Sequence, residues 1–210
     1  MRNGKISRLL VFVMAVSALA ACSKTTTSIP LSWRNPDFQH TAFKKLFIIG
    51  VGENEGARRL FEDTFAKALA YEGTSAQASW GQLPQSTQLT EEQVLGAVEG
   101  GGFDGVLVTR LLSVDQSEEY VPGSTYVVPP TYYGHGYYGY YGSSYDVVHQ
   151  PGYFKTNTTF RIETNLYAVA GGGLVWSGQS QTLNPESLTD VIDSMTAAVA
   201  KKLKQEKLIP

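Results

Sequence analysis

Short apolar runs alternate with amphipathic helical stretches in the first half of the chain, and this alternation restricts the possible folds more than any other feature. Strand-like runs cover 44–52 (KKLFIIGVG) and 103–114 (FDGVLVTRLLSV), and a weaker one, SAQASW, covers 75–80. Apolar residues at helical spacing cover 55–73, and a second helical stretch covers 89–102. This βαβαβ order predicts parallel strands joined by right-handed crossovers.

The second half of the chain has an antiparallel pattern. Residues 154–169 alternate between a face of apolar and threonine side chains and a face of charged and amide side chains, which is typical of a half-buried strand. AGGG at 170–173 predicts a turn, and 174–182 returns as the hairpin partner. Residues 184–208 predict an amphipathic C-terminal helix. We therefore predict one α/β domain with a single mixed sheet of about five strands and about three helices.

Two predicted helices carry end signals. Thr90, with Gln93 three positions later, predicts a capping box at the start of the second helix. Gly73 predicts the end of the first helix, because glycine adopts the left-handed conformation of a helix C-terminus without strain.

The N-terminus predicts export and lipidation. Residues 1–21 have a basic start and an apolar stretch, 9–19, which is the anatomy of a signal peptide. LAAC at 19–22 resembles the lipobox of bacterial lipoproteins, which implies that Cys22 receives a diacylglycerol and becomes the acylated first residue. The alternative is an ordinary secretory leader with an incidental cysteine. Ser23 stands where an aspartate would retain an enterobacterial lipoprotein at the inner membrane, so we expect delivery to the outer membrane.

Charge and cysteine content exclude several classes of function. The leader holds three of the 17 Lys and Arg residues and none of the 19 Asp and Glu residues, so the remaining chain has a formal charge of −5. An acidic chain without a basic run is a poor binder of nucleic acid or of anionic lipid. Cys22 is the only cysteine, so the predicted domain, 43–210, has no disulfide. Residues 22–42, which are rich in Ser and Thr and contain Pro30 and Pro36, predict a tether. We expect Trp33 or Phe38 to dock on the domain.

A Tyr/Gly/Pro-rich insert covers 118–152. Ten of the chain's 12 tyrosines lie between Tyr120 and Tyr153. STYVVPP and SYDVVHQPG flank the glycine-rich centre, and we expect them to pair as a short β-ribbon. Tyrosine with glycine is typical of adaptable binding surfaces, and the alternative is a low-complexity insertion without a contact. The residues that we expect to contact a partner are Tyr132, Tyr133, Tyr137, Tyr138, Tyr140 and Tyr141.

No motif predicts catalysis, a cofactor or a metal. Gly50, Gly52 and Gly56 form a GxGxxxG, a loose relative of the dinucleotide fingerprint, but Glu53 and Glu55 would repel phosphate, so a tight turn is the better interpretation. His40, His135 and His149 lie in the tether and the insert, where a site with Asp146 is conceivable but a solvated loop is favoured. The carboxylate pairs Glu62/Asp63, Glu91/Glu92 and Asp190/Asp193 are expected on solvated helix faces or near helix N-termini.

Several motifs together resemble a known class of protein. These are the lipobox, SWRNP, LFIIGV, GGFDGVLVTRL, the Tyr/Gly/Pro-rich insert and ETNLYAVAGGGLVWSGQSQT before a final helix. In this combination the chain resembles a family of uncharacterised Gram-negative envelope lipoproteins. The order of elements is also similar to the periplasmic domains of penicillin-binding-protein activator lipoproteins and of the curli-secretion lipoprotein, which bind protein partners. The long insert departs from that second pattern.

These observations together predict a non-enzymatic lipoprotein. We expect it to be anchored at the periplasmic face of the outer membrane and to engage a protein partner in a cell-envelope assembly. The alternative is a glycan-binding module whose tyrosines stack on peptidoglycan or an exported polysaccharide. A hydrolase is a third alternative, and it would need a cluster of polar side chains at the strand ends near Glu53.

Overall fold

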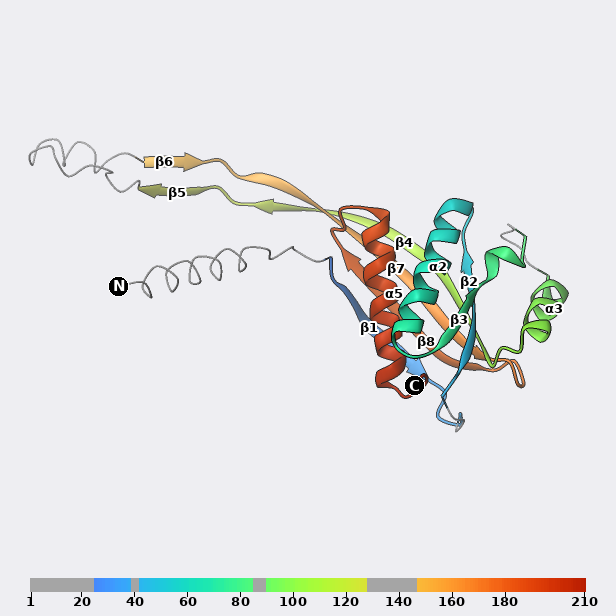
Figure 1. Cartoon of the computed structure of the whole chain (residues 1–210). Coiled ribbons are helices and arrows are strands. Elements are labelled where there is room, and N and C mark those ends of the chain that lie inside the picture. The colour runs from blue at the N-terminus through green and yellow to red at the C-terminus, as the bar shows by residue number, and fades with distance from the viewer. Residues whose placement is uncertain (1–24, 39–41, 85–89, 128–146) are drawn as a thin grey trace, which may run out of the picture.

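The computed structural model describes residues 25–38, 42–84, 90–127 and 147–210 (Figure 1). A six-stranded mixed sheet has the order β1-β8-β7-β4-β2-β3, and β5 and β6 form a separate two-stranded sheet. The strands are β1 (Thr27–Arg34), β2 (Lys45–Val51), β3 (Ser75–Ala78), β4 (Gly105–Val121), β5 (Ser124–Val127), β6 (Val147–Gln150), β7 (Tyr153–Ala168) and β8 (Leu174–Leu183). The helices are α2 (Glu55–Tyr71), the short 3-10 helix η2 (Ser79–Gly81), α3 (Glu91–Gly101) and α5 (Leu188–Gln205).

The βαβαβ prediction is confirmed. Strand β2 pairs in parallel with both β3 and β4. Its side chains are buried on both faces, as is usual in a parallel sheet that helices cover on both sides: Leu46 and Ile48 face one core, and Phe47 and Ile49 face the other. The predicted capping box at Thr90 is present, with both of its reciprocal hydrogen bonds.

Helices α2 and α5 lie side by side on one face of the sheet, and α3 covers the other (Figure 1). The main core lies between α2, α5 and the sheet, and Phe65, Leu107, Trp176 and Leu203 are fully buried there. Burying each such side chain contributes about 1.5–3 kcal/mol to folding. The apolar stripe predicted for α5 is confirmed except at its first residue, Leu188, which is half exposed.

The β7–β8 hairpin is antiparallel, as predicted, and β1 adds a sixth strand beyond it. The predicted tether is therefore wrong over Thr27–Arg34. Pro30 is tolerated because it lies within a register shift between Ser28 and Leu31 on an edge strand, where proline interrupts no continuous ladder. The Thr27 hydroxyl oxygen lies 2.6 Å from Thr182 Oγ1 and 2.7 Å from Ser194 Oγ, so a residue of linker-like composition is bonded to the domain.

One of the two aromatic residues that we expected to dock, Phe38, docks on the domain as predicted. Phe38 packs against the main core and stacks on Phe43 with ring centroids 5.5 Å apart. Trp33 is 48% exposed. The chain's other end is also fixed, because Leu208 and Ile209 are buried and the Leu208 carbonyl accepts a 2.8 Å hydrogen bond from Phe43 N.

The predicted alternation of β7 holds only in its second half. Ile162, Thr164, Leu166 and Ala168 are buried beneath the helices, as expected for a half-buried strand. In the first half both faces are exposed or half exposed, and Phe154 has 69% of its surface exposed. The cause is that α5 and β8 do not extend along this segment, so no helix or further strand in the described part of the chain covers it.

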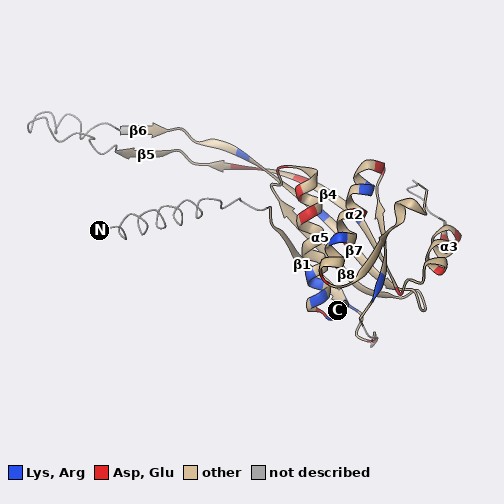
Figure 2. Cartoon of the chain, in the orientation of Figure 1, with Lys and Arg blue, Asp and Glu red and all other residues tan. Residues whose placement is uncertain are grey.

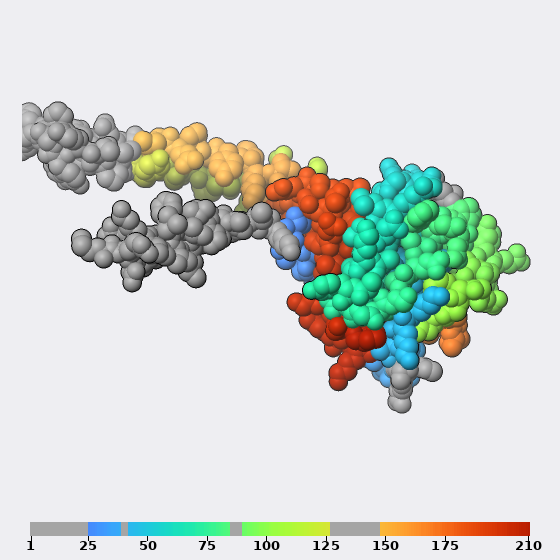
Figure 3. All heavy atoms as spheres, viewed as in Figure 1, coloured from blue at the N-terminus to red at the C-terminus, as the bar shows by residue number. Residues whose placement is uncertain are grey.

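A two-stranded arm leaves the domain at one end (Figures 1 and 3). Thr27, Thr182, Phe160 and Val114 form one transverse row of the sheet, because they are successive register partners from β1 to β4. Past this row β8 adds one residue, Leu183, which pairs with Thr159. Beyond it only β4 and β7 continue among the described strands of this sheet, still paired to their ends at Val121 and Tyr153. We define the arm as 115–127 with 147–159, and the distal arm as 120–127 with 147–154.

The predicted β-ribbon is confirmed within the described part of the insert. Strands β5 and β6 pair antiparallel from Ser124–Gln150 to Val127–Val147 and extend the line of β4 and β7. The insert, which we placed at 118–152, therefore starts inside a strand, since 118–121 still belong to β4.

Candidate functional site

The GxGxxxG segment forms a tight strand-to-helix turn at the end of the sheet from which the arm leaves. Asn54 caps α2, and its side chain accepts a 2.9 Å hydrogen bond from Ala57 N. Gly50 is required by packing, because an added Cβ would lie 2.9 Å from Phe61 Cδ1. An added Cβ on Gly52 would meet nothing within 4 Å. The packing and the helix cap account for this turn without a bound phosphate.

Glu62, which we expected on a solvated helix face, is fully buried. Its Oε1 accepts hydrogen bonds from Gly50 N, Arg58 Nε and Ser79 Oγ at 2.8–2.9 Å, and its Oε2 accepts one from Trp80 N at 2.8 Å. Arg58 is also buried, and its Nη2 donates to Ser79 Oγ at 2.9 Å. The expectation was wrong because helical periodicity places Glu62 beside Phe61 and Phe65, towards β2 and η2. The cluster joins β2, α2 and η2.

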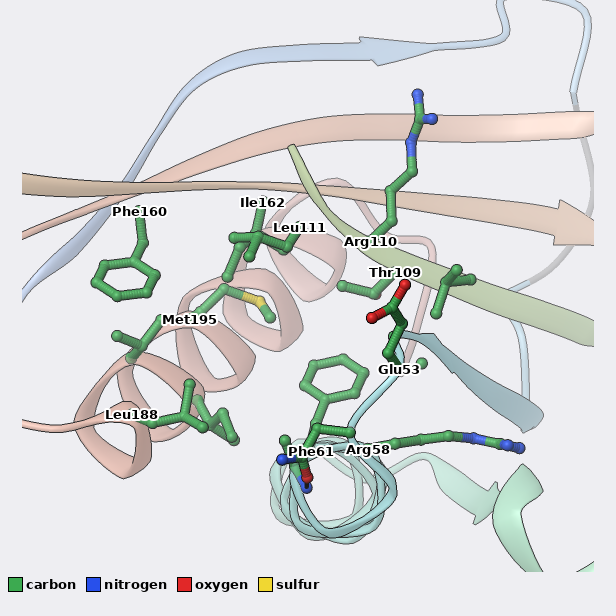
Figure 4. Close-up of a pocket in the computed structure, with 17 residues that line it drawn as sticks. Glu53, Arg58, Phe61, Thr109, Arg110, Leu111, Phe160, Ile162, Leu188 and Met195 are labelled. Atoms are coloured by element: carbon green, nitrogen blue, oxygen red, sulfur yellow. Dashed lines mark hydrogen bonds between the residues drawn. The ribbon is translucent and has the colours of Figure 1, made fainter. Parts of the chain in front are cut away.

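A groove of about 320 Å³ lies beside this turn, between the ends of α2 and α5 and the sheet (Figure 4). Phe61, Phe160, Ile162, Leu188 and Met195 surround it, and the side chains of Arg58 and Arg110 point away from it. Another groove, of about 350 Å³, lies on the opposite face of the sheet beneath α3.

The groove offers an apolar surface rather than a converging polar site. Among its described lining residues, Thr109 shares a 3.0 Å hydrogen bond with Thr164, and Arg110 Nε donates to Glu163 Oε2 at 2.8 Å. These side chains are engaged with neighbours in the sheet.

The base of the arm carries ionic contacts between its two strands. Arg161 Nε donates to Asp115 Oδ2 at 2.7 Å, and Asn157 Nδ2 donates to Glu119 Oε2 at 3.1 Å. The hydrogen bond from Arg161, helped by one from the Ser113 side chain, lowers the pKa of Asp115 below its ordinary value. Cross-strand pairs of this kind hold the register of a ribbon that has no core.

The distal arm is aromatic and uncharged. Tyr120, Tyr126, Tyr153 and Phe154 each have more than half of their surface exposed. The rings of Tyr120 and Phe154 pack at 5.2 Å between centroids. Residues 120–127 and 147–154 contain no Lys, Arg, Asp or Glu, whereas the proximal part carries both signs of charge (Figure 2). Sequence reasoning did not identify Phe154 as an arm residue. The signal in the sequence was that residues 155–159 are polar at odd-numbered and even-numbered positions alike, so neither face of this part of the strand is apolar.

Most of the predicted site residues lie outside the described residues. These are Cys22, the six tyrosines at 132, 133, 137, 138, 140 and 141, His40, His135 and Asp146. His149 is described, and its Nδ1 lies 2.8 Å from Thr125 Oγ1 across the ribbon. Within the described part of the chain, no three His, Cys, Asp or Glu side chains are grouped as a metal site would require.

None of the helices that the structure describes has the length and apolarity that crossing a membrane demands.

Comparison with known proteins gives only distant similarities. No family model matches the sequence, and no curated protein matches it. Among solved structures, the PelC dodecamer from Paraburkholderia phytofirmans is similar at 13% identity, over 83% of this chain and 95% of that chain, with a TM-score of 0.45. Lipoprotein GNA1162 from Neisseria meningitidis is similar at 12% identity, over 77% and 99%, with a TM-score of 0.40. Similarity of this extent assigns neither a family nor a function to the chain.

Proposed function

We propose that this chain is a lipid-anchored protein of the Gram-negative envelope that acts by binding a protein partner, without catalysis, and that the arm makes the contact. Its place would be the periplasmic face of the outer membrane. The anchor is supported by the leader and by LAAC, which put Cys22 five residues before the first strand.

The arm is the observation that carries the proposal. A domain of this size does not need a ribbon that stands clear of its core, and the described residues of both core clusters include none from 113–154. Exposed aromatic residues on such a ribbon incur an aggregation risk that a binding partner removes. Tyrosine rings supply large, rigid contact area with a polar tip, which suits a protein interface.

The six tyrosines that we predicted as contacts, residues 132, 133, 137, 138, 140 and 141, follow β5 in the sequence and belong to this proposal. A glycan ligand is the second candidate. Exposed aromatic faces without nearby charge, such as those of Tyr153 and Phe154, also suit stacking on sugar rings.

Photo-crosslinking in living cells tests the proposed function. A photoreactive residue would replace Tyr126 on the described arm or Tyr138 in the insert. Tyr71, which is 89% exposed at the end of α2 remote from the arm, is the matched control.

We expect a discrete protein adduct from the arm positions and none from Tyr71. An adduct at Tyr71 alone, or no protein adduct at any of the three positions, would overturn the arm as a protein-binding surface. Arm-dependent sedimentation with purified sacculi, without a protein adduct, would instead establish the glycan candidate.

A further inference from the structure

We infer that the partner of the arm is an integral protein of the same membrane that holds the lipid anchor, and that the distal arm meets it at the membrane surface. This inference rests on the proposed function, since it needs a lipid on Cys22 and a protein partner on the arm. It adds the class of partner and the place of contact, which neither the leader nor the insert specifies.

The start of β1, which follows the proposed anchor in the sequence, and the base of the arm lie at the same end of the domain. Thr27, the first residue of β1, belongs to the transverse row in which Val114 and Phe160 begin the arm. Strand β1 runs from this row away from the arm (Figure 1), so its first residue, Thr27, lies at the end of the domain that carries the arm. The C-terminus lies at the other end, where Arg34 Nη1 donates to the Glu206 carbonyl.

The segment between Cys22 and β1 is short compared with the arm. Cys22 precedes Thr27 by five residues, which span at most about 17 Å when fully extended. The arm from Asp115 to Val127 spans about 40 Å at roughly 3.3 Å per residue. An arm longer than its tether cannot stay clear of a membrane that it points towards. It must tilt along the membrane surface, and its distal part then lies at the level of the lipid headgroups.

Charged side chains are confined to the part of the arm nearest the domain. The charged side chains of the described arm, Asp115, Glu118, Glu119 and Lys155, all lie in the proximal part, which remains in water. The distal part has only aromatic, aliphatic, small and uncharged polar side chains. Such a segment is not penalised for leaving bulk water, and tyrosine is enriched at membrane–water interfaces because its ring is amphipathic.

The backbone edges of the distal arm favour a protein over lipid alone as its binding partner. Strands β5 and β6 pair only with each other in the described part of the chain, so the outer edge of each presents unpaired backbone N–H and C=O groups. Lipid hydrocarbon cannot satisfy these groups. An extended segment or sheet edge of an embedded protein can, by adding a strand to the ribbon. The distal arm therefore fits a protein surface at the headgroup level better than it fits the hydrocarbon.

The test uses the full chain in cells, with a photoreactive residue at Tyr126 and the control at Tyr71. It compares the native chain with Cys22→Ala behind an ordinary secretory leader. Because anchoring confines both proteins to one surface, we expect the Tyr126 adduct to fall by about tenfold or more when the anchor is lost. We also expect the adduct's partner to stay in the membrane pellet after alkaline extraction of cells that make Cys22→Ala.

Four results would overturn the inference: a partner that alkaline extraction releases, an adduct with phospholipid alone, an adduct between two copies of this chain, or an unchanged yield in Cys22→Ala. A soluble protein partner at Tyr126 would leave the proposed function standing. Failure of the proposed function has a separate signature, which is no incorporation of labelled palmitate at Cys22 or no protein adduct on the arm. Equal thermal melting of the native and Cys22→Ala chains shows that the substitution leaves the fold intact.

Discussion

Single residues hold the end of the domain from which the arm leaves. Gly50 and Glu62 are the clearest cases, because the first provides space for Phe61 and the second binds the Gly50 amide. Both lie where β2 turns into α2, beneath the groove. We expect substitutions here to affect the stability of the whole domain rather than a binding event.

Glu62→Gln tests the buried ionic cluster. The change leaves Arg58 buried without its counter-charge, so we expect the free energy of unfolding to fall by about 3 kcal/mol, measured by urea denaturation. Glu99→Gln, at an exposed position of α3, is the control and should shift it by no more than about 0.5 kcal/mol. Equal effects in the two variants would contradict a structural role for the cluster.

Gly50→Ala tests the close approach of Phe61. A Cβ at 2.9 Å from Phe61 Cδ1 forces that ring or the helix to move, and we expect a loss of about 1–3 kcal/mol. Gly52→Ala introduces the same methyl group two residues later into open space, and its loss should not exceed about 0.5 kcal/mol. Thermal unfolding of the two variants measures the difference between their losses of stability. Equal losses would contradict the packing explanation.

The Asp115 carboxyl reports the ionic contact at the arm base. Because its pKa is lowered in the folded chain, the contact stabilises the fold above the ordinary aspartate pKa, and this stabilisation is lost as the pH falls through the lowered pKa. Carboxyl NMR titration should therefore show a midpoint below the ordinary value, and Arg161→Gln should raise it. Arg110→Gln, which removes a cation bonded to Glu163 instead, should leave it in place. An Asp115 titration midpoint that Arg161→Gln leaves unchanged would refute the contact.

At the scale of elements, β1 is the strand whose status matters most, because it fixes where the chain's N-terminal part leaves the domain. Ile29 packs against the main core, whereas Leu31, two residues along the same strand, is 60% exposed beyond the register shift.

Ile29→Ala should therefore lower the free energy of unfolding by about 1–2 kcal/mol, a fraction of the loss at a fully buried site. Leu31→Ala should cost no more than about 0.5 kcal/mol. Chemical denaturation of both variants measures these changes in the free energy of unfolding. If neither has a measurable effect, residues 27–34 behave as a tether and not as a strand of the domain.

The whole molecule has two unlike ends. One end carries the arm, the start of β1, the strand-to-helix turn and the apolar groove, and the other carries the C-terminus and the end of α2. In the arrangement that we propose, this polarity would let a lipid anchor at Cys22 set the direction of the arm.

Removing the distal arm tests the separation of domain and arm. Glu119 and Lys155 are register partners, so replacing 120–154 by Asn-Gly closes the two strands with a two-residue hairpin. We expect the Tm to change by only a few degrees, since the described core residues all lie outside the deleted segment. Circular dichroism melting measures it. A collapse of the Tm would show that the arm is part of the folding unit.

The sequence by itself determined the elements whose patterns are local. The helices and the cap at Thr90 follow from residues three or four positions apart, and the strands other than β1, with the β5–β6 ribbon, follow from short β-rich runs. The βαβαβ order then leaves few ways to arrange the parallel strands.

Only the tertiary structure decided three features. Strand β1 looks like linker because its Ser and Thr residues become ordered only through partners some 155 positions away, such as Thr182. Glu62 looks solvated in the sequence because a carboxylate is normally exposed. It is buried because Arg58, Ser79 and two backbone amides, which the folded turn brings together, all donate hydrogen bonds to it. The position of the start of β1 beside the base of the arm follows from a register across four strands. In each case at least some of the stabilising partners lie 12 or more positions away in the sequence, beyond the reach of local patterns.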